Sequence, residues 1–187
     1  MASLKTSLSK VLKYEGGYVD DPSDPGGETY AGVSRRYWPN WVGWAHIDGI
    51  KDKTHLDIYV PIQDAVVAFY QEHFWGRIRG DSIQIQQVAD ELLECAVHVG
   101  VHQAVKFVQT GLNILNRNGT NYKDLVVDGE IGNQTLYTIN LYARNSLSSD
   151  VEVLIKVLNI LQGAYYIEKM AESDRKERFA RGWLSRV

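Results

Sequence analysis

The chain has 187 residues, of which 44% are hydrophobic and 23% charged, and it contains 4 prolines. This composition is typical of one ordinary globular domain, with or without a small appended lobe, and excludes disordered and collagen-like chains. The formal net charge is -3 and no block of five like charges occurs. A general nucleic-acid binder is normally more basic, so we expect no nucleic-acid partner.

The single cysteine, Cys95, lies in an apolar run. One cysteine excludes an internal disulfide and a zinc site built on two thiolates, and Cys95 is predicted to be a buried hydrophobe rather than a reactive thiol. The N-terminal residues contain no long apolar stretch and no small-residue cleavage site. We therefore expect a protein made in the cytoplasm without a signal peptide and not inserted stably in a membrane.

Five segments carry apolar residues at helical spacing, which predicts a mainly helical protein. The first, 3–14, ends at Gly16 and Gly17, and the second begins at Pro61, a residue that suits the first turn of a helix. The third follows 80–82, the fourth follows Gly100, and the fifth opens with capping-box spacing at Ser149 and Glu152. The stripes are Leu4, Leu8, Val11 and Leu12; Ile62, Ala65, Val66, Phe69, Tyr70 and Phe74; Val88, Leu92, Ala96 and Val99; Val101, Val105, Val108, Leu112 and Leu115; and Leu154, Ile155, Leu158, Leu161 and Tyr165.

The segment 20–27, DDPSDPGG, holds two prolines and two glycines and is predicted to be an irregular loop. The aromatic stretch after it, 28–44, is expected to be loop with a short strand. No internal repeat is visible, and the one plausible seam lies near Gly80.

Glu15 stands at the end of the first predicted helix, directly before this loop. The partial negative charge of a helix C-terminus disfavours an ionised carboxylate, and burial would raise its pKa further. A glutamate with a raised pKa can act as the general acid of a glycosidase. From the pattern alone, a solvated glutamate beside a surface turn remains the alternative.

The run EGGYVDDPSDPGGETYAGVSRRYWPNWVGW resembles the N-terminal signature of glycoside hydrolase family 108, muramidases known as phage endolysins or secretion activators. The resemblance continues in FYQEHFWGRIRGDSI, DELLECAVHVGVHQAVKFVQTGLNIL, VVDGEIGNQTL and FARGWLSRV, and so spans nearly the whole chain. It implies a single lysozyme-like helical domain. It also implies that the glutamate of the EGGY motif, here Glu15, is the catalytic acid.

The chain departs from the family pattern in its middle segment. Where relatives have an aspartate and then an asparagine before a glycine, it has Glu94, His98 and Gly100. His98 can donate a hydrogen bond to a sugar or peptide and is a candidate groove residue. His98 and His102 have the spacing of helical metal ligands, but the glutamate of a zincin motif is missing, so we expect no metal and no cofactor.

Other candidates lie in the loop after the EGGY motif or are aromatic residues. Asp21, Asp24 and Thr29 are expected to shape the loop or bind substrate, with a direct role in the chemistry as the alternative. Among the aromatic residues, Tyr18, Tyr30 and Trp75 are predicted to line a glycan groove, because sugar rings stack on aromatic faces. For Trp38, Trp41 and Trp44 the prediction is core packing, with a groove role as the alternative. For Tyr30 and Trp75, core packing is the alternative to the groove.

The segment 128–135, DGEIGNQT, resembles the turn of small helical peptidoglycan-binding modules. Its glycines allow a tight turn and Asn133 can cap the next helix. The resemblance implies wall recognition by this C-terminal half, and the alternative is that the half forms the other side of the catalytic groove. The tail from Lys169 has six basic and three acidic residues, which fits an anionic partner or a solvated helix face. We expect a catalytic muramidase region at 1–80 and a helical peptidoglycan-binding-like region at 81–187 packed against it.

Together these features predict a monomeric N-acetylmuramidase that cleaves the β-1,4 bond between N-acetylmuramic acid and N-acetylglucosamine in peptidoglycan glycan strands. It would act in the periplasm or cell wall after delivery by a holin or a secretion route. A lytic transglycosylase, or a non-catalytic wall-binding or secretion-accessory protein, is the alternative.

Overall fold

The computed structural model describes residues 1–187 except 22–25, 146–147, 174–176 and 178. The protein is mainly helical, as the apolar spacing predicts. The principal helices are α1 (Leu4–Glu15), α2 (Gly43–Asp48), α3 (Val60–Tyr70), α4 (Gln86–Val99), α5 (Val101–Ile114), α6 (Asn133–Asn145), α7 (Ser148–Ala171) and α9 (Ala180–Leu184). Short helical turns occur at η1 (Leu56–Ile58), η2 (Gln71–Trp75) and η3 (Gly80–Ser82).

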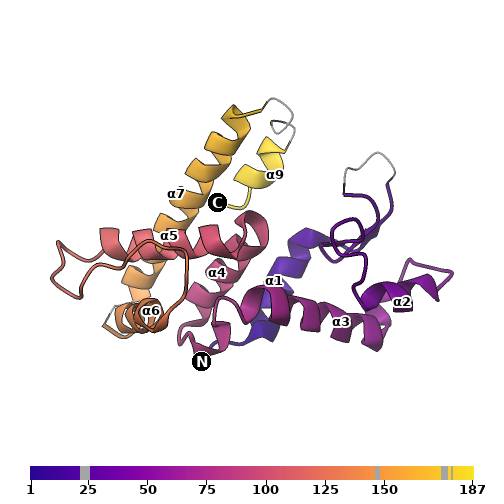
Figure 1. The fold of residues 1–187 in the computed structure, drawn as a ribbon, viewed down its shortest axis with the longest axis horizontal. Helices are drawn as coiled ribbons and strands as arrows, with labels where there is room; N and C mark the ends of the chain where they lie inside the picture. The colour runs from indigo at the N-terminus through magenta and orange to yellow at the C-terminus, as the bar shows by residue number, and fades with distance from the viewer. Residues whose placement is uncertain (22–25, 146–147, 174–176, 178) are drawn as a thin grey trace.

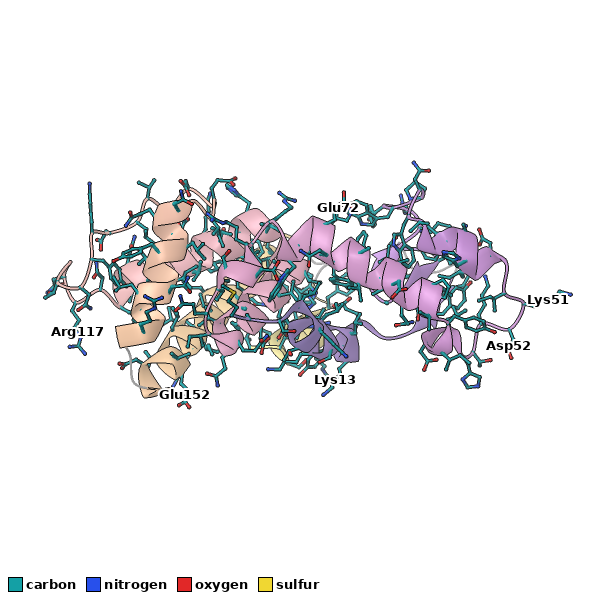
Figure 2. The ribbon with its side chains drawn as sticks, turned by 90° about the horizontal axis from the view of Figure 1, so that it is seen from below. Lys13, Lys51, Asp52, Glu72, Arg117 and Glu152 are labelled. Atoms are coloured by element: carbon teal, nitrogen blue, oxygen red, sulfur yellow. The ribbon has the colours of Figure 1, made fainter. Side chains whose placement is uncertain are left out.

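Helix α4 lies at the centre of the molecule and packs against α1, α5 and α7. Figure 1 shows α1 to α3 on one side of it and α5 to α7 on the other, along the longest axis. The labelled Arg117 and the Lys51–Asp52 loop mark opposite ends of that axis in Figure 2. The predicted stripe of α4 supplies the packing, since Val88, Leu92 and Ala96 are all buried.

A polar cluster joins α1 to α4 and fixes the helix that ends at Glu15. The Ser7 hydroxyl donates to Asp90 Oδ1 over 2.6 Å, and Lys10 Nζ lies 2.5 Å from Asp90 Oδ2. Gln86 Nε2 donates to the same Oδ1 over 2.7 Å. Buried polar atoms are satisfied in this way, so the register between the two helices is specified by hydrogen bonds as well as by apolar contacts.

A small antiparallel sheet follows α1, with strands β1 (Tyr18–Val19), β2 (Thr29–Tyr30) and β3 (Val33–Ser34) in that order. Tyr30 pairs with Val33, so Ala31 and Gly32 form a two-residue hairpin loop, with φ of 48° and 79°. Two consecutive positive φ values are typical of a type I′ turn, whose twist matches that of the strands. The expected strand therefore forms, and it turns back toward the end of α1.

Candidate active site

Glu15 is the last residue of α1 and is followed by Gly16 in a left-handed conformation, with φ of 72°. Its side chain is 18% exposed and Oε1 is buried without a hydrogen-bond partner. Glu15 is therefore a largely buried carboxyl group at a helix C-terminus. The alternative of a solvated surface glutamate does not hold.

The two carboxyl oxygens of Glu15 have different neighbours. Oε1 lies 3.4 Å from His98 Nε2 and 3.5 Å from Arg186 Nη1. Oε2 lies beside Gly32, where an added Cβ would be 3.0 Å from Oε2 and 2.7 Å from the Tyr70 hydroxyl. That hydroxyl donates to the carbonyl of Ala31 over 3.0 Å, so the hairpin loop and α3 together close one side of the site.

Burial raises the pKa of Glu15 above its usual 4.5, and the charge of Arg186 partly offsets this rise. An acid with a raised pKa keeps its proton at higher pH, as a general acid requires. The adjacent Glu94 on α4 also has a raised pKa. Burial is the main cause, the charge of Arg186 opposes the rise, and the charge of Glu15 adds to it. The site thus favours protonated carboxyl groups.

Burial, followed by the charge of Arg186, lowers the pKa of His98 to about 4, so its imidazole is neutral over most of the working pH range. Arg186 Nη1 makes a short contact with His98 Nε2. Because a guanidinium carries donors only, Nε2 accepts and the ring proton belongs on Nδ1. His98 is next to Glu15, as its candidate role requires, but Nε2 has no proton to give the carboxylate.

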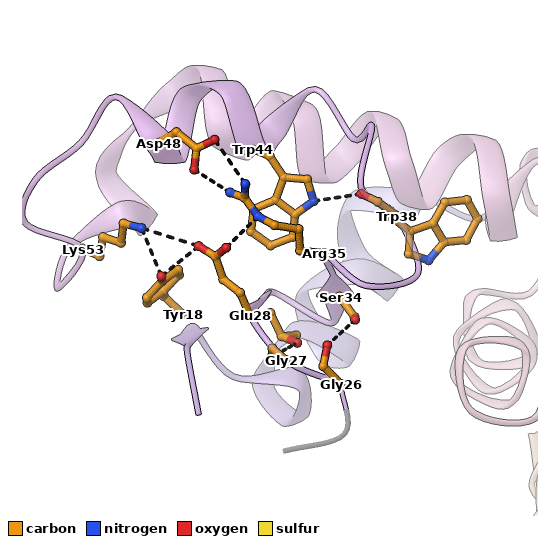
Figure 3. Close-up of polar contacts among 11 residues, drawn as sticks. Tyr18, Gly26, Gly27, Glu28, Ser34, Arg35, Trp38, Trp44, Asp48 and Lys53 are labelled. Carbon is orange, nitrogen blue, oxygen red and sulfur yellow. Dashed lines mark hydrogen bonds and ion pairs between the residues drawn. The ribbon is translucent and has the colours of Figure 1, made fainter. Parts of the chain in front are cut away.

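Tyr18 lies in β1, in a charged network that Figure 3 shows beside α2. Its hydroxyl donates to Glu28 Oε1 over 2.8 Å and accepts from Lys53 Nζ over 3.0 Å. Glu28 Oε2 lies 2.6 Å from Arg35 Nε, and Arg35 reaches on to Asp48 and lies over the ring of Trp44. This network ties the small sheet to α2 and holds the phenol of Tyr18 in place.

Of the loop residues, Asp21 is exposed and takes part in polar contacts, whereas Asp24 lies outside the described residues. Thr29 is half-buried in β2, and its hydroxyl donates to the carbonyl of Gly27 over 3.1 Å. This hydrogen bond is consistent with the predicted role of Thr29 in shaping the loop. The roles of Asp21, Asp24 and Thr29 toward substrate stay predictions.

Two predicted groove residues belong to the core instead. Tyr30 is 4% exposed and its hydroxyl accepts a hydrogen bond from Gln63, so it offers no face to a glycan. Trp75 is fully buried, and its indole N–H donates to Asp81. It ends a π-helical turn in which the N–H of Gly76 bonds to the carbonyl of Gln71, and this wider turn shifts the side chains relative to a regular α-helix. Both groove predictions are wrong because each side chain faces the core.

The tryptophans before α2 divide between core and surface. Trp41 and Trp44 are buried and pack edge to face at 5.1 Å, as predicted. Trp38 is 38% exposed and contacts His73 and Phe69 at the wall of a cavity of about 370 Å³. Core packing is therefore the wrong expectation for Trp38, because its ring stays partly exposed beside Phe69 and His73.

The segment 128–135 forms the predicted turn before α6. Gly129 has a φ of 79°, and its N–H donates to Gln109 of α5 over 2.9 Å. Gln109 also donates to Asp128 over 2.8 Å. Asn133 begins α6, and its side-chain oxygen accepts a hydrogen bond from Arg79 Nη1 over 2.8 Å.

Sequence reasoning missed three contributors to the Glu15 site. Gly32 and Tyr70 show only as a loop residue and as part of an apolar stripe, and neither pattern points to Glu15. Arg186 is far away along the chain, and its one signal is that it falls in the terminal family-like motif FARGWLSRV. Their proximity arises from tertiary packing.

Within the described residues, no cluster of three or more histidine, cysteine or acidic side chains could hold a metal ion. In the same part of the chain, none of the helices combines the length and the apolar character needed to cross a bilayer.

Comparison with known proteins finds a family match in each half of the chain. Residues 8–100 match the family described as glycosyl hydrolase 108, and residues 103–187 match a predicted peptidoglycan domain. The first match ends at Gly100, between α4 and α5, so it includes α4. The sequence analysis predicts a seam earlier in the chain, near Gly80.

Among solved structures, the chain is similar to Brucella abortus SagA, with a TM-score of 0.59 and 25% identity, covering 98% of this chain and 88% of that one. No curated protein matches the sequence. The chain thus belongs to the glycosyl hydrolase 108 family through its N-terminal half and carries a predicted peptidoglycan domain in its C-terminal half.

Proposed function

We propose that the protein is a peptidoglycan hydrolase, an N-acetylmuramidase that cleaves the β-1,4 bond between N-acetylmuramic acid and N-acetylglucosamine. The observation that carries this proposal is Glu15, a largely buried carboxyl group with a raised pKa, at the end of α1 in the half that matches a glycosidase family. The match of residues 103–187 to a predicted peptidoglycan domain supports the substrate and a site of action at the cell wall.

In this reaction, protonated Glu15 gives its proton to the bridging oxygen as the bond from that oxygen to the anomeric carbon breaks. A water molecule adds to the anomeric carbon and releases a proton to the solvent, from which ionised Glu15 regains its own proton, and the product has a reducing muramic end. We assign two described residues to substrate binding: His98, which lies beside Glu15, and Tyr18, which lies in β1. Asp21, Asp24 and Thr29 are assigned to shaping the loop or to binding.

Delivery to the cell wall by a holin or a secretion route, and action as a monomer, belong to the same proposal.

The muramidase proposal also predicts how kcat/KM depends on pH. Only protonated Glu15 can donate, so kcat/KM falls as pH rises through the raised pKa of Glu15. A rate that stays flat between pH 4 and 9 would contradict the assignment of the acid.

The test is digestion of purified peptidoglycan by the wild type and by Glu15→Gln, with borohydride-reduced products identified by mass spectrometry. Glu15→Gln keeps the shape of the side chain and removes the acid, and we expect at least about a 10³-fold loss of soluble products. Glu72→Gln is the matched control, because Glu72 is an exposed residue of η2 with no role in the proposed site, and it should keep wild-type activity.

The products also separate the alternatives. Anhydro ends in place of reducible ends would identify a lytic transglycosylase, in which the 6-hydroxyl of the sugar replaces water. Binding of peptidoglycan without soluble products from any variant would identify a non-catalytic wall-binding or secretion-accessory protein.

A further inference from the structure

The C-terminal segment after α9 brings a permanent cation to Glu15. Arg186 Nη1 lies 3.5 Å from Glu15 Oε1, and the Arg186 side chain is 16% exposed. The same guanidinium lies over the ring of Tyr14, with Cζ 5.4 Å from its centroid, and contacts His98. Figure 1 shows the C-terminus beside one end of α4, near the helix that carries Glu15. Arg186 is thus enclosed by α1 and α4.

The segment that carries Arg186 is anchored on both sides of it. The ring of Trp183 in α9 packs on Tyr166 of α7 at 5.2 Å and stacks on Phe179 at 5.9 Å. Val187 lies against α7, where a Cβ at Gly163 would be 3.4 Å from its side chain. These apolar contacts fix the backbone before and after Arg186, so its position does not depend on the ion pair alone.

Among the described residues, the titratable groups around Glu15 come from three elements, and the Ala31–Gly32 hairpin loop adds none. Tyr70 comes from α3, Glu94 and His98 come from α4, and Arg186 comes from the C-terminal segment. His98 is neutral, Glu94 is acidic and Tyr70 is an uncharged phenol. In the described part of the chain, Arg186 is therefore the one permanently charged cation in contact with the Glu15 carboxyl group.

We propose that Arg186 is a positioning residue for Glu15, through which the C-terminal half of the chain sets the orientation and the proton affinity of the acid in the N-terminal half. This inference rests on the proposed function. The guanidinium attracts the ionised carboxylate, whereas burial favours the protonated form, and the balance of the two fixes the pH at which the acid loses its proton.

The sign of the effect follows from this balance. Replacement of Arg186 by a neutral residue removes the attraction for the ionised form, so Glu15 keeps its proton to higher pH. An opposite charge at this distance shifts a carboxyl pKa by about one unit or more. The alkaline limb of kcat/KM should therefore move upward by about one pH unit in Arg186→Gln.

The experiment compares the pH profiles of kcat/KM for four proteins acting on purified peptidoglycan: the wild type, Arg186→Gln, Arg186→Lys and Arg181→Gln. Arg186→Lys keeps the charge and should return the limb to within a few tenths of a unit of the wild type. Arg181→Gln is the matched control, since it removes an equal charge from an exposed position on α9. Its limb should coincide with that of the wild type.

A second measurement does not need turnover. A ¹³C NMR titration of the glutamate carboxyl groups, with the Glu15 signal assigned by its loss in Glu15→Gln, should show the same upward shift in Arg186→Gln. An unmoved Glu15 titration, or a higher plateau rate with an unmoved limb, would overturn the proposal, because a tail that merely blocks the site gives the latter.

The two proposals fail in different ways. A wild type that releases no soluble products refutes the muramidase while the NMR titration still tests the coupling of Arg186 to Glu15. An active wild type with an inactive Glu15→Gln and an unmoved limb in Arg186→Gln refutes the positioning role alone.

Discussion

Glu91 is a further acidic residue on α4 whose side chain is mostly buried. Burial, and next the charge of Glu94, raise its pKa from the usual 4.5 to about 7. Its partner is the buried Cys95, whose sulfur lies 3.9 Å from Glu91 Oε1 and 2.6 Å from Gln162 Oε1. Cys95 is buried as the sequence predicts, and burial raises the pKa of its thiol well above the ordinary value. Neither group has a role in the proposed reaction. Their burial matters for the stability of the fold.

The raised pKa of Glu91 makes the protein's stability depend on pH. Because the folded-state pKa lies above the unfolded one, this stabilising contribution is complete below about pH 4.5 and is lost as pH rises through about 7. Glu91→Gln should remove this loss, which is about 3 kcal/mol at most. Urea unfolding at pH 5 and pH 8 measures it. An equal pH dependence in Glu91→Gln and the wild type would contradict the prediction.

Gly32 offers a second test at single-residue scale. Its φ is +79°, and a methyl group there would lie 3.0 Å from Glu15 Oε2 and 2.7 Å from the Tyr70 hydroxyl. Gly32→Ala should lower kcat at least about tenfold, since displacement of an acid by a fraction of an ångström is costly. Gly27→Ala is the control: its φ is +64° with nothing within 4 Å, so it carries the backbone strain without the collision. An equal kcat in the two variants would contradict this role of Gly32.

At the scale of elements, the contact between α1 and α4 is what brings Glu15 to His98. Ser7 and Asp90, both buried, lie at its centre, and Gln86 also bonds to the backbone of Ser3. The cluster needs both helices, because its donors and acceptors come from residues about 80 positions apart. Loss of its acceptor, Asp90, would remove a hydrogen bond or an ion pair from each of three side chains.

Asp90→Ala removes that acceptor from Ser7, Lys10 and Gln86. A hydrogen bond to a charged group contributes about 1.5–3 kcal/mol, so we expect a loss of about 2–3 kcal/mol in the free energy of unfolding. Chemical denaturation gives this value. Asp64→Ala, an exposed position on α3, should change it by less than about 0.5 kcal/mol. A similar small change in both variants would show that the cluster contributes no stability.

At the scale of the whole molecule, α4 joins the two halves that the family matches separate. It packs against α1 on one side and against α5 and α7 on the other. Arg79 and Asn133 form a further bond between the two halves. Division of the chain at Gly100 would therefore expose the apolar face of α4 and separate Arg186 from Glu15.

We accordingly expect the full chain to unfold in a single cooperative transition in calorimetry, with equal calorimetric and van't Hoff enthalpies. A fragment of residues 1–102 should lack a cooperative transition, because α4 loses its partners. Two resolved transitions in the full chain, or a stably folded fragment, would show that the N-terminal half is independent of the C-terminal half.

The sequence by itself determined the helical class, the apolar stripes and the position of Glu15 before a glycine-rich turn. Val88, Leu92 and Ala96 are buried as their spacing predicts, because helical periodicity is a local property that survives in the folded protein. The hairpin turn at Ala31 and the π-turn at Trp75 were not predicted in detail. Each depends on a local change of register that average periodicity conceals.

Only the tertiary structure decided what surrounds Glu15 and which aromatic rings face solvent. Tyr30 and Trp75 are buried while Trp38 is exposed, and the aromatic residue type by itself does not separate the three. Arg186 reaches Glu15 because α9 packs on α7 and α7 packs on α4, a chain of contacts with no counterpart in sequence spacing. Residue type and local spacing specify elements, whereas the pKa of an acid depends on the burial and the charges that distant segments bring to it.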